Sequence, residues 1–444
     1  MRILSFEVEK LFGYYNYHIQ FKQDVTIIHG PNGCGKTTLI KLIDWIFNNK
    51  IYELKAVKFE KISILLSDNT LINVEQEKLS VELENHKITQ IIFNVFVPNE
   101  DVKTYKFPDI SDMNPIVQVL NGKRRIAPFI EKISDDLWFD RRSGENLTLE
   151  QMINKYGDMI GRHYIENFEP GDVPEELATI LRQIKVKFIT ADRLKVQTSE
   201  TRYGNSSVKV EMRVDIIARE IAEKIKTAIN EYAQLSQAKD RSFPVRAIKN
   251  RKALTIEQIK EKMIELENKR KELVANGFLE ETENITIQEL IESITDESKK
   301  ILTVYVADTE EKLNTFSKIS ALINMFKDLL SSNFALKEIV FDQNQGFYFS
   351  PMYSSETKIV PTNLSSGEQQ EIVMFYDLIF NTSADTLVLV DEPELSLHIK
   401  WQLEYVDEML KIINENDFYT LIATHSPQII NDKWDYTISL GEEG

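Results

Sequence analysis

The sequence predicts an α/β fold in which a largely parallel sheet is built from two distant parts of the chain. Near the N-terminus, the apolar run VTIIHG precedes a glycine-rich loop and TTLIKLIDWIFNN, which has helical spacing. After about residue 335, the apolar segments TLVLVDEP and YTLIATHSP alternate with the helical segment HIKWQLEYVDEMLKIINE. Alternating strands and helices indicate parallel strands joined by crossovers. We therefore expect both ends of the chain to share one sheet.

The sequence patterns in the middle of the chain predict antiparallel hairpins and packed helices. Alternating segments within 56–107 predict antiparallel hairpins, and 112–183 is expected to be mixed and mainly helical. Further on, apolar residues recur at spacings of three and four, which predicts packed helices, either an ordinary helical domain or a short coiled coil. Since twenty residues of helix span only about 30 Å, we expect a short projection. The expected domains are an N-terminal lobe at 1–195, a helical insertion at 196–334 and a C-terminal lobe at 335–444.

Composition indicates an ordinary soluble protein. The chain has 444 residues, of which 42% are hydrophobic and 28% charged, enough for two or three domains. We expect no signal peptide and no membrane span, because no apolar run approaches about 18–20 residues. The single cysteine excludes an intrachain disulfide and fits a reducing cytoplasm. A formal charge of −17 argues against a uniformly basic nucleic-acid surface, although a local basic groove stays open.

The glycine-rich loop matches the phosphate-binding pattern G-x-x-x-x-G-K-[ST] in full. The residues expected to bind nucleotide here are Gly30, Pro31, Asn32, Gly33, Cys34, Gly35, Lys36, Thr37 and Thr38. Glycines let backbone amides curl around phosphates, Lys36 neutralises the β- and γ-oxygens, and the Thr37 hydroxyl can bind Mg²⁺. Cys34 is interpreted as a small packing residue, since no histidine is placed to activate it. The position between a predicted strand and a predicted helix supports a P-loop ATPase.

Polar residues also follow the two apolar strands near the C-terminus. Asp391 is placed to hold the Mg²⁺ shell, and Glu392 to act as the general base that polarises an attacking water. His425 can stabilise charge forming on a γ-phosphate, or it can be a capping or packing residue. His398 either orders its loop or caps the following helix. Arg193, after the strand VKFIT, is either a nucleotide sensor or a surface ion-pair residue.

The stretch LSSGEQQ presents a second anion site. Ser365, Ser366, Gly367 and Glu368 open a predicted helix, whose exposed N–H groups and positive dipole end favour an anion. One nucleotide rarely needs two phosphate sites from a single molecule. The two sites belong together if they come from different copies of the chain.

The four motifs GPNGCGKTT, LSSGEQQ, LVLVDEPELSLH and ATHSPQ occur in the order and spacing of ABC-type ATPase heads. They resemble most the overcoming-lysogenization-defect (OLD) branch and the SMC, Rad50 and RecF-like proteins. The resemblance covers about 1–50 and 335–430. Ile399 stands where the OLD-like group usually has proline, and Ser366 and Glu368 depart from the common L-S-G-G-Q signature.

This resemblance implies an ATPase that binds ATP with Mg²⁺ and hydrolyses it to ADP and phosphate. It also implies a head-to-head dimer, in which Ser365 and Gly367 of one copy close on the ATP held by Lys36 of the other. OLD nucleases continue into a Toprim domain and Rad50 carries a C-x-x-C zinc hook, and neither fits this sequence. The histidines do not form an H-N-H arrangement either. We therefore expect a chain that is not itself a nuclease.

The resemblance favours the stand-alone ATPase subunit of a bacterial anti-phage defence system. Such subunits partner a separately encoded effector, a Toprim nuclease in PARIS or an H-N-H nuclease in Septu, and a phage-encoded protein is one option for the trigger. The alternative is a RecF- or Rad50-like DNA-repair ATPase. The basic stretch AKDRSFPVRAIKNRK at 238–252 fits DNA binding or an ordinary solvated face. The large insertion disfavours a transporter subunit, and an intact Glu392 disfavours a scaffold without turnover.

Overall fold

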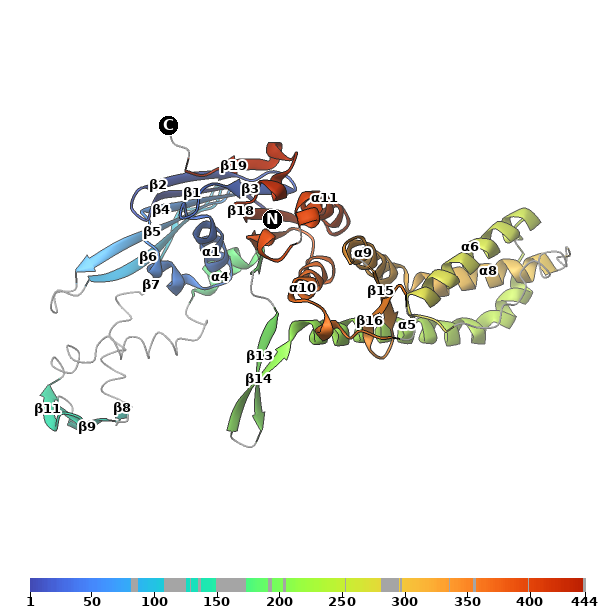
Figure 1. Ribbon diagram of the computed structural model, residues 1–444, viewed down its shortest axis with the longest axis horizontal. Coiled ribbons are helices and arrows are strands. Elements are labelled where there is room, and N and C mark those ends of the chain that lie inside the picture. The colour runs from blue at the N-terminus through green and yellow to red at the C-terminus, as the bar shows by residue number, and fades with distance from the viewer. Residues whose placement is uncertain are drawn as a thin grey trace.

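A parallel sheet of five strands, counted over the described part of the chain, lies at the centre of this computed structural model (Figure 1). In spatial order the strands are β12 (Lys185–Ile189), β17 (Thr386–Asp391), β18 (Tyr419–Thr424), β3 (Val25–His29) and β19 (Thr437–Ser439). β3 comes from the N-terminal part of the chain, and it pairs in parallel with β18 and β19 from the C-terminal part. The expectation of one sheet built from both ends is confirmed.

The structure describes most of the chain, with gaps. The described residues are 1–80, 87–107, 125–127, 129–134, 137–148, 173–190, 194–202, 205–251, 253–280, 295, 298–334, 336–353, 357–397 and 399–441. Arg193 and His398, both named above as candidates, lie outside them. None of the helices in these ranges is long and apolar enough to span a lipid bilayer.

The three central strands of the parallel sheet, β17, β18 and β3, are buried on both faces, which explains their unbroken apolar runs. In β17, Leu387 and Leu389 pack on one side, in a core shared with helix α1 (Lys36–Phe47) and an antiparallel sheet. Val388 and Val390 pack on the opposite side, in a core shared with α10 (Ser366–Phe380) and α11 (Ile399–Asn416). The sheet is therefore the middle layer of the head, and its strand ends hold their positions rigidly.

The antiparallel sheet comes from the first quarter of the chain. Its strands in spatial order are β2 (Tyr15–Gln20), β1 (Ile3–Leu11), β4 (Lys61–Leu66), β5 (Leu71–Ser80), β6 (Lys87–Phe96) and β7 (Lys103–Phe107). β4 to β7 pair antiparallel in chain order, so the hairpins expected within 56–107 are confirmed. A short 3₁₀ helix, η1 (Ile51–Ala56), connects α1 to this sheet.

The expectation of a mainly helical segment at 112–183 is wrong for residues 125–148. A small antiparallel sheet forms there from β8 (Arg125–Ala127), β9 (Ile130–Ser134), β10 (Leu137–Asp140) and β11 (Glu145–Thr148). These strands are too short to give a clear period, and the fully buried Trp138 packs on the pleated surface. A helix, α4 (Glu175–Arg182), follows further along the chain.

The insertion begins with a hairpin of β13 (Lys195–Arg202) and β14 (Asn205–Met212), and only then becomes helical. Its helices are α5 (Arg213–Lys249), α6 (Ile256–Ala275), α8 (Ser298–Asn314) and α9 (Ser317–Asn333). The far part of α5 packs with α6 and α8 in an arm that extends away from the parallel sheet (Figure 1). At 37 residues, α5 is about 55 Å long, which is longer than expected. Its buried first part lies in the head, and the residues beyond Ala228 span about 30 Å, the length expected for the projection.

Helix α9 returns to the head, where Phe326 contacts Tyr376 and Phe380 of α10. The remaining elements are β15 (Lys337–Asp342), β16 (Gly346–Pro351), the 3₁₀ helices η4 (Pro361–Asn363), η5 (Pro393–Ser396) and η6 (Trp434–Tyr436), and the short helix α12 (Pro427–Ile430). The expected fold class is confirmed: a largely parallel sheet, an antiparallel β part and a helical insertion. The domain limits at 195 and 334 stay a prediction.

Candidate nucleotide-binding site

The carboxyl ends of three neighbouring parallel strands bring most of the predicted site residues together. β3 ends at His29, directly before the P-loop, and its neighbour β18 ends directly before His425. β17, on the other side of β18, ends at Asp391. In open α/β sheets, ligands bind at this edge. The order β17-β18-β3 therefore places the two acids, the histidine and the phosphate-binding loop side by side.

The P-loop wraps around the first residue of α1. It consists of Gly30, Pro31, Asn32, Gly33, Cys34 and Gly35, and Lys36, Thr37 and Thr38 begin the helix. Gly35 has a left-handed φ of 97°, and a Cβ on Gly30 would lie 2.3 Å from a backbone oxygen. Lys36 is buried, and its Nζ donates to the carbonyls of Gly30 (2.8 Å) and Pro31 (3.1 Å). The loop is thus preformed around the ammonium group.

Cys34 is buried, with its Sγ 4.0 Å from Lys36 Nζ, as suits a packing residue. An open hollow of about 340 Å³ lies beside the loop. It is lined by His29, Gly30, Pro31, Asn32, His425, Pro427, Ile430 and Trp434. The first turn of the P-loop and His425 therefore face the same space.

Thr37 and Asp391 supply two oxygen atoms at one point of the site. Thr37 Oγ1 donates a hydrogen bond of 3.1 Å to Asp391 Oδ1. Burial raises the pKa of the Asp391 carboxyl, and the Thr37 hydrogen bond partly opposes that shift. Hydroxyl and carboxylate oxygens are ligands that Mg²⁺ prefers. The donor set fits a magnesium ion, which Thr37 and Asp391 would hold.

Glu392 leaves the end of β17 in an unusual conformation. Its φ of 46° is left-handed, which is uncommon for a residue with a side chain. Its backbone N–H donates to Ala423 O of β18 (2.9 Å). Strained backbone of this kind clusters at functional sites. The Glu392 carboxylate stays partly exposed, with its Oε1 3.7 Å from His425 Nδ1.

Glu394 also belongs to the site, and the sequence analysis assigned it no role. It lies in η5, and its Oε1 is 3.0 Å from His425 Nδ1. The same oxygen accepts hydrogen bonds from Thr424 Oγ1 (2.7 Å) and from the His425 backbone N–H (2.9 Å). The only sequence signal for Glu394 is that it is the third acid in the motif DEPE. Nothing in the sequence indicated that this acid faces a strand end about thirty residues away.

The signature residues lie at the start of α10. Ser365 is its N-cap and forms a capping box with Glu368, while Ser366 and Gly367 occupy the first turn. Lys337 Nζ lies 2.6 Å from Glu368 Oε1. Burial alone would raise the pKa of Glu368, but the ion pair with Lys337 and the Ser365 hydrogen bonds hold it below its ordinary value. Ser365 remains exposed.

The structure therefore brings together the P-loop, Asp391, Glu392 and His425, and leaves the signature apart. The side-chain hydrogen bonds and ion pairs of Ser365 and Glu368, within the described residues, go to each other and to Lys337. α10 lies between the parallel sheet and the arm, and α1 lies on the other side of the sheet (Figure 1). In one copy of the chain, the P-loop and the signature turn thus lie in separate places.

Comparison with known proteins gives a family but no close relative. No curated protein matches the chain. It is similar to the crystal structure of the SmcHead bound to the C-winged helix domain of ScpA, at 10% identity and a TM-score of 0.34, covering 99% of this chain and 94% of that one. It is also similar to the Smc head domain with an extended coiled coil bound to the C-terminal domain of ScpA, from Pyrococcus furiosus, at 13% identity and a TM-score of 0.35, covering 99% and 93%.

The AAA ATPase domain family matches residues 1–430, which is nearly the whole chain. This match agrees with the P-loop, the acidic strand end and the parallel sheet described above. It also supports ATPase activity for the chain. The protein belongs to the AAA ATPase domain family.

Proposed function

We propose that the chain hydrolyses ATP at composite sites between two copies of itself, and that it acts in the cytoplasm as the sensor or scaffold subunit of an anti-phage defence system. In this role it controls a separately encoded effector, a nuclease of Toprim or H-N-H type, in response to a trigger such as a phage-encoded protein. The chain itself is not a nuclease. The observation that carries the composite site is the separation of the signature helix from the P-loop within one copy.

The chemistry of hydrolysis follows from the positions of the side chains. The P-loop amides and Lys36 bind the substrate phosphates, and Thr37 and Asp391 hold Mg²⁺, which neutralises phosphate charge when bound. A water oxygen attacks the γ-phosphorus, the bond to the β-phosphate oxygen breaks, and Glu392 accepts the water proton. His425 donates a hydrogen bond to the γ-phosphate as its charge redistributes.

Exposed apolar residues support pairing of two copies. Leu395 and Ile399, which follow Glu392 closely, are 63% and 65% exposed. Met352, Tyr353 and Val360, which precede the signature, are 67%, 84% and 46% exposed. Exposed apolar groups of this size mark interaction surfaces when they gather. They flank the two elements that the dimer would bring together.

A mixture of two inactive variants tests the composite site. Lys36→Ala removes the phosphate-binding lysine, and Ser365→Arg blocks the signature turn. A mixed dimer has one site with both defects and one intact site, so mixing should restore up to about a quarter of the wild-type rate. Circular dichroism shows that the variants are folded, and copurification of the two variants through a tag on only one of them shows that mixed dimers form. Mixed dimers without any turnover would overturn the composite site.

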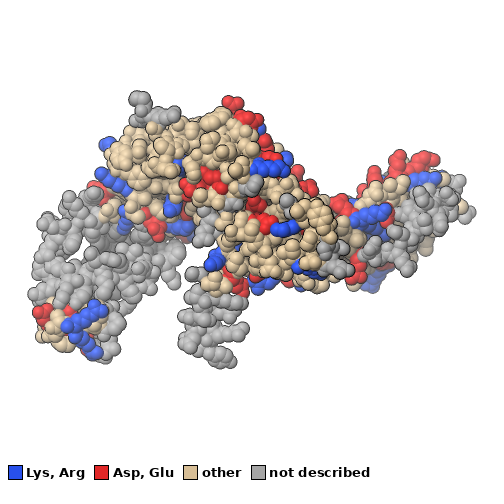
Figure 2. Space-filling model, in the orientation of Figure 1, with Lys and Arg blue, Asp and Glu red and all other residues tan. Residues whose placement is uncertain are grey.

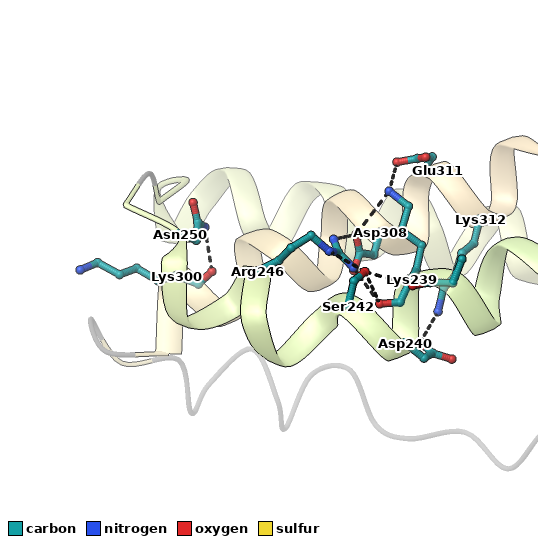
Figure 3. A network of polar contacts seen from close by, with 10 residues as sticks. Lys239, Asp240, Ser242, Arg246, Asn250, Lys300, Asp308, Glu311 and Lys312 are labelled. Atoms are coloured by element: carbon teal, nitrogen blue, oxygen red, sulfur yellow. Dashed lines mark hydrogen bonds and ion pairs between the residues drawn. The ribbon is translucent and has the colours of Figure 1, made fainter.

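The basic stretch at 238–252 supports a structural role for some of its residues more than a DNA groove. Arg246 pairs with Asp308 of α8, and Lys239 contacts Asp308 and Glu311 (Figure 3). These cations hold α5 and α8 together within the arm. On the face shown in Figure 2, Lys and Arg side chains lie among Asp and Glu side chains over the head and the arm. A continuous basic groove would be needed for strong DNA binding.

Isolation of the native complex from its host separates defence from DNA repair. The tagged chain is purified at physiological salt, with Lys36→Ala as a control that fails to form the ATP-bound state. Copurification of a small nuclease or a viral protein supports the proposed defence role. Copurification of broken DNA, with binding that weakens steeply as salt rises, supports a RecF- or Rad50-like repair ATPase instead.

A further inference from the structure

We propose that Glu394 is the positioning residue of this site: its carboxylate sets the orientation and the proton position of His425, and so determines which ring nitrogen faces the substrate. This inference rests on the proposed ATP hydrolysis at the same site. Glu394 does not touch the reacting atoms in this scheme. It acts through the histidine.

A single oxygen of Glu394 holds both the backbone and the ring of the His425 segment. Oε1 accepts from Thr424 Oγ1 and from the His425 N–H, and it lies 3.0 Å from His425 Nδ1. The Glu394 side chain is only 6% exposed, whereas that of His425 is 41% exposed. The histidine therefore projects from a buried anchor towards the open hollow beside the P-loop. Loss of that anchor frees the ring to rotate.

The anchor also decides where the ring proton lies. An ionised carboxylate only accepts hydrogen bonds, so the ring nitrogen that faces Glu394 carries a proton. His425 Nδ1 is the nitrogen in contact, so Nε2 faces the substrate, and Nε2 donates to the γ-phosphate when the ring carries a proton on both nitrogens. Glu392 competes for the same Nδ1 but is farther away, at 3.7 Å against 3.0 Å. Glu394 thus occupies the histidine and leaves the Glu392 carboxylate available to a water molecule.

A second bridge fixes the position of Glu394 itself. Gln402 of α11 donates from Nε2 to the backbone oxygens of Leu397 (3.1 Å) and Glu394 (3.4 Å). Its Oε1 accepts from Ser426 Oγ (2.9 Å), directly after the histidine. The turn that follows Glu392 and the loop that carries His425 are consequently tied together twice. Gln402 contacts neither ring nitrogen of His425, so it offers a matched control.

The remaining oxygen of Glu394 argues against a purely stabilising role. Oε2 is buried and has no hydrogen-bond partner among the described residues. A buried carboxylate oxygen without a partner costs folding free energy. Glutamine at this position keeps one acceptor oxygen for the three donors and removes the charge. It also places an amide NH2 at the buried Oε2 position, so Glu394→Gln should lose less stability than Glu394→Ala, which removes the acceptor altogether, while the histidine loses its ionic partner in both.

The test compares Glu394→Ala, Glu394→Gln and Gln402→Ala by ATP turnover and thermal unfolding. Glu394→Ala should lower kcat about 10–100-fold, the range seen when a histidine loses its orienting carboxylate, and should change KM less than threefold. Glu394→Gln should lower kcat to a similar extent with a smaller loss of Tm than Glu394→Ala. Gln402→Ala should lower Tm with a smaller loss of kcat. The same loss of kcat and Tm in all three variants would mean a structural role only.

A double-mutant cycle with His425→Ala decides whether Glu394 acts through the histidine. In the His425→Ala background, Glu394→Ala should cause no further loss of kcat. Nitrogen NMR of labelled histidine should show a proton on His425 Nδ1 in the wild type. In Glu394→Ala, the proton should no longer favour Nδ1 over Nε2. If Glu394→Ala lowers kcat by the same factor in the His425→Ala background as in the wild type, the inference is overturned. If Lys36→Ala fails to abolish hydrolysis, the proposed function fails instead, so the two failures are distinguishable.

Discussion

Thr37 and Asp391 are 354 positions apart in the sequence and meet through a hydrogen bond of 3.1 Å between Thr37 Oγ1 and Asp391 Oδ1. This contact joins the start of α1 to the end of β17 across the carboxyl edge of the sheet. It places a hydroxyl and a carboxylate where a divalent cation can bind both. The candidate site is therefore assembled from the two ends of the chain.

Asp391→Asn should raise the Mg²⁺ concentration required for half-maximal ATP turnover by at least about tenfold, because a neutral amide binds Mg²⁺ less strongly than a carboxylate. Titration of Mg²⁺ at saturating ATP measures the change. Thr37→Ser keeps the hydroxyl and should behave like the wild type. An unchanged Mg²⁺ requirement in Asp391→Asn would remove this residue from the metal site.

Glu392→Gln should lower kcat about 10²–10⁴-fold, which is the usual contribution of a general base. Binding of ATP should persist, because the P-loop and the Thr37–Asp391 pair are unaffected. Single-turnover hydrolysis and binding of a fluorescent ATP analogue separate the two effects. Glu415→Gln, the same change at an exposed position of α11, is the control. Turnover close to the wild-type rate in Glu392→Gln would exclude Glu392 as the base.

Stability should fall as pH rises through neutrality, because two buried acids lie on α10 and α11. Burial, with the nearby charges of Glu368 and Glu408, raises the pKa of Glu371 to about 8. Burial also raises the pKa of Glu408 to about 7, with a contribution from Glu404. In the unfolded chain both ionise near pH 4.3. The favourable contribution of the two acids to the free energy of unfolding is complete below about pH 4.3, and it is lost as the pH rises to 7–8.

Glu371→Gln should accordingly raise the free energy of unfolding at pH 8.5 by something of the order of 2 kcal/mol and leave it nearly unchanged at pH 4.5. Denaturant unfolding at a series of pH values measures this difference. Glu415→Gln, on an exposed site, should leave the pH dependence as it is. A Glu371→Gln protein with the same pH dependence as the wild type would contradict the prediction.

Asp308→Ala should loosen the arm without affecting hydrolysis. Asp308 is buried and accepts from Arg246, and it lies 3.8 Å from Lys239 (Figure 3). Loss of hydrogen bonds to charged partners should cost about 1.5–3 kcal/mol, seen as faster hydrogen exchange in the far part of α5.

Asp240→Ala is the matched control in the same helix pair. Asp240 is 70% exposed and forms a single ion pair with Lys312, so its removal should cost less than about 1 kcal/mol. Equal exchange rates in the two variants would show that the Asp308 network does not hold the arm.

Much of the candidate site could be predicted because its polar residues directly follow apolar strands. Asp391 and His425 each follow an apolar run, and the edge of a parallel sheet gathers such residues without further information. The role of Glu394 could not be predicted in this way. Its contacts depend on the left-handed backbone at Glu392 and on the path of the turn after it, which no local pattern encodes.

In the fold, too, some elements could be predicted from the sequence and others could not. Three strands of the central sheet, β3, β17 and β18, are evident from the sequence because they are buried on both faces, whereas the three-residue edge strand β19 was not predicted. The strands around Trp138 were missed, since segments of three to five residues have almost no period. The length of α5 was also underestimated. Its buried residues extend from Val214 to Ala228, and beyond them the helix continues without a buried residue and packs locally with α8.

The continuity of α5 has a mechanical consequence. Its first half is fixed in the core of the head and its second half is the spine of the arm, while Pro244 lies only in the last two turns. A rotation of about 5° where the helix leaves the head displaces the far end by roughly 3 Å, because the residues beyond Ala228 form a lever of about 30 Å. A small rotation of the first half of α5 therefore produces its largest displacement at the far end of the arm.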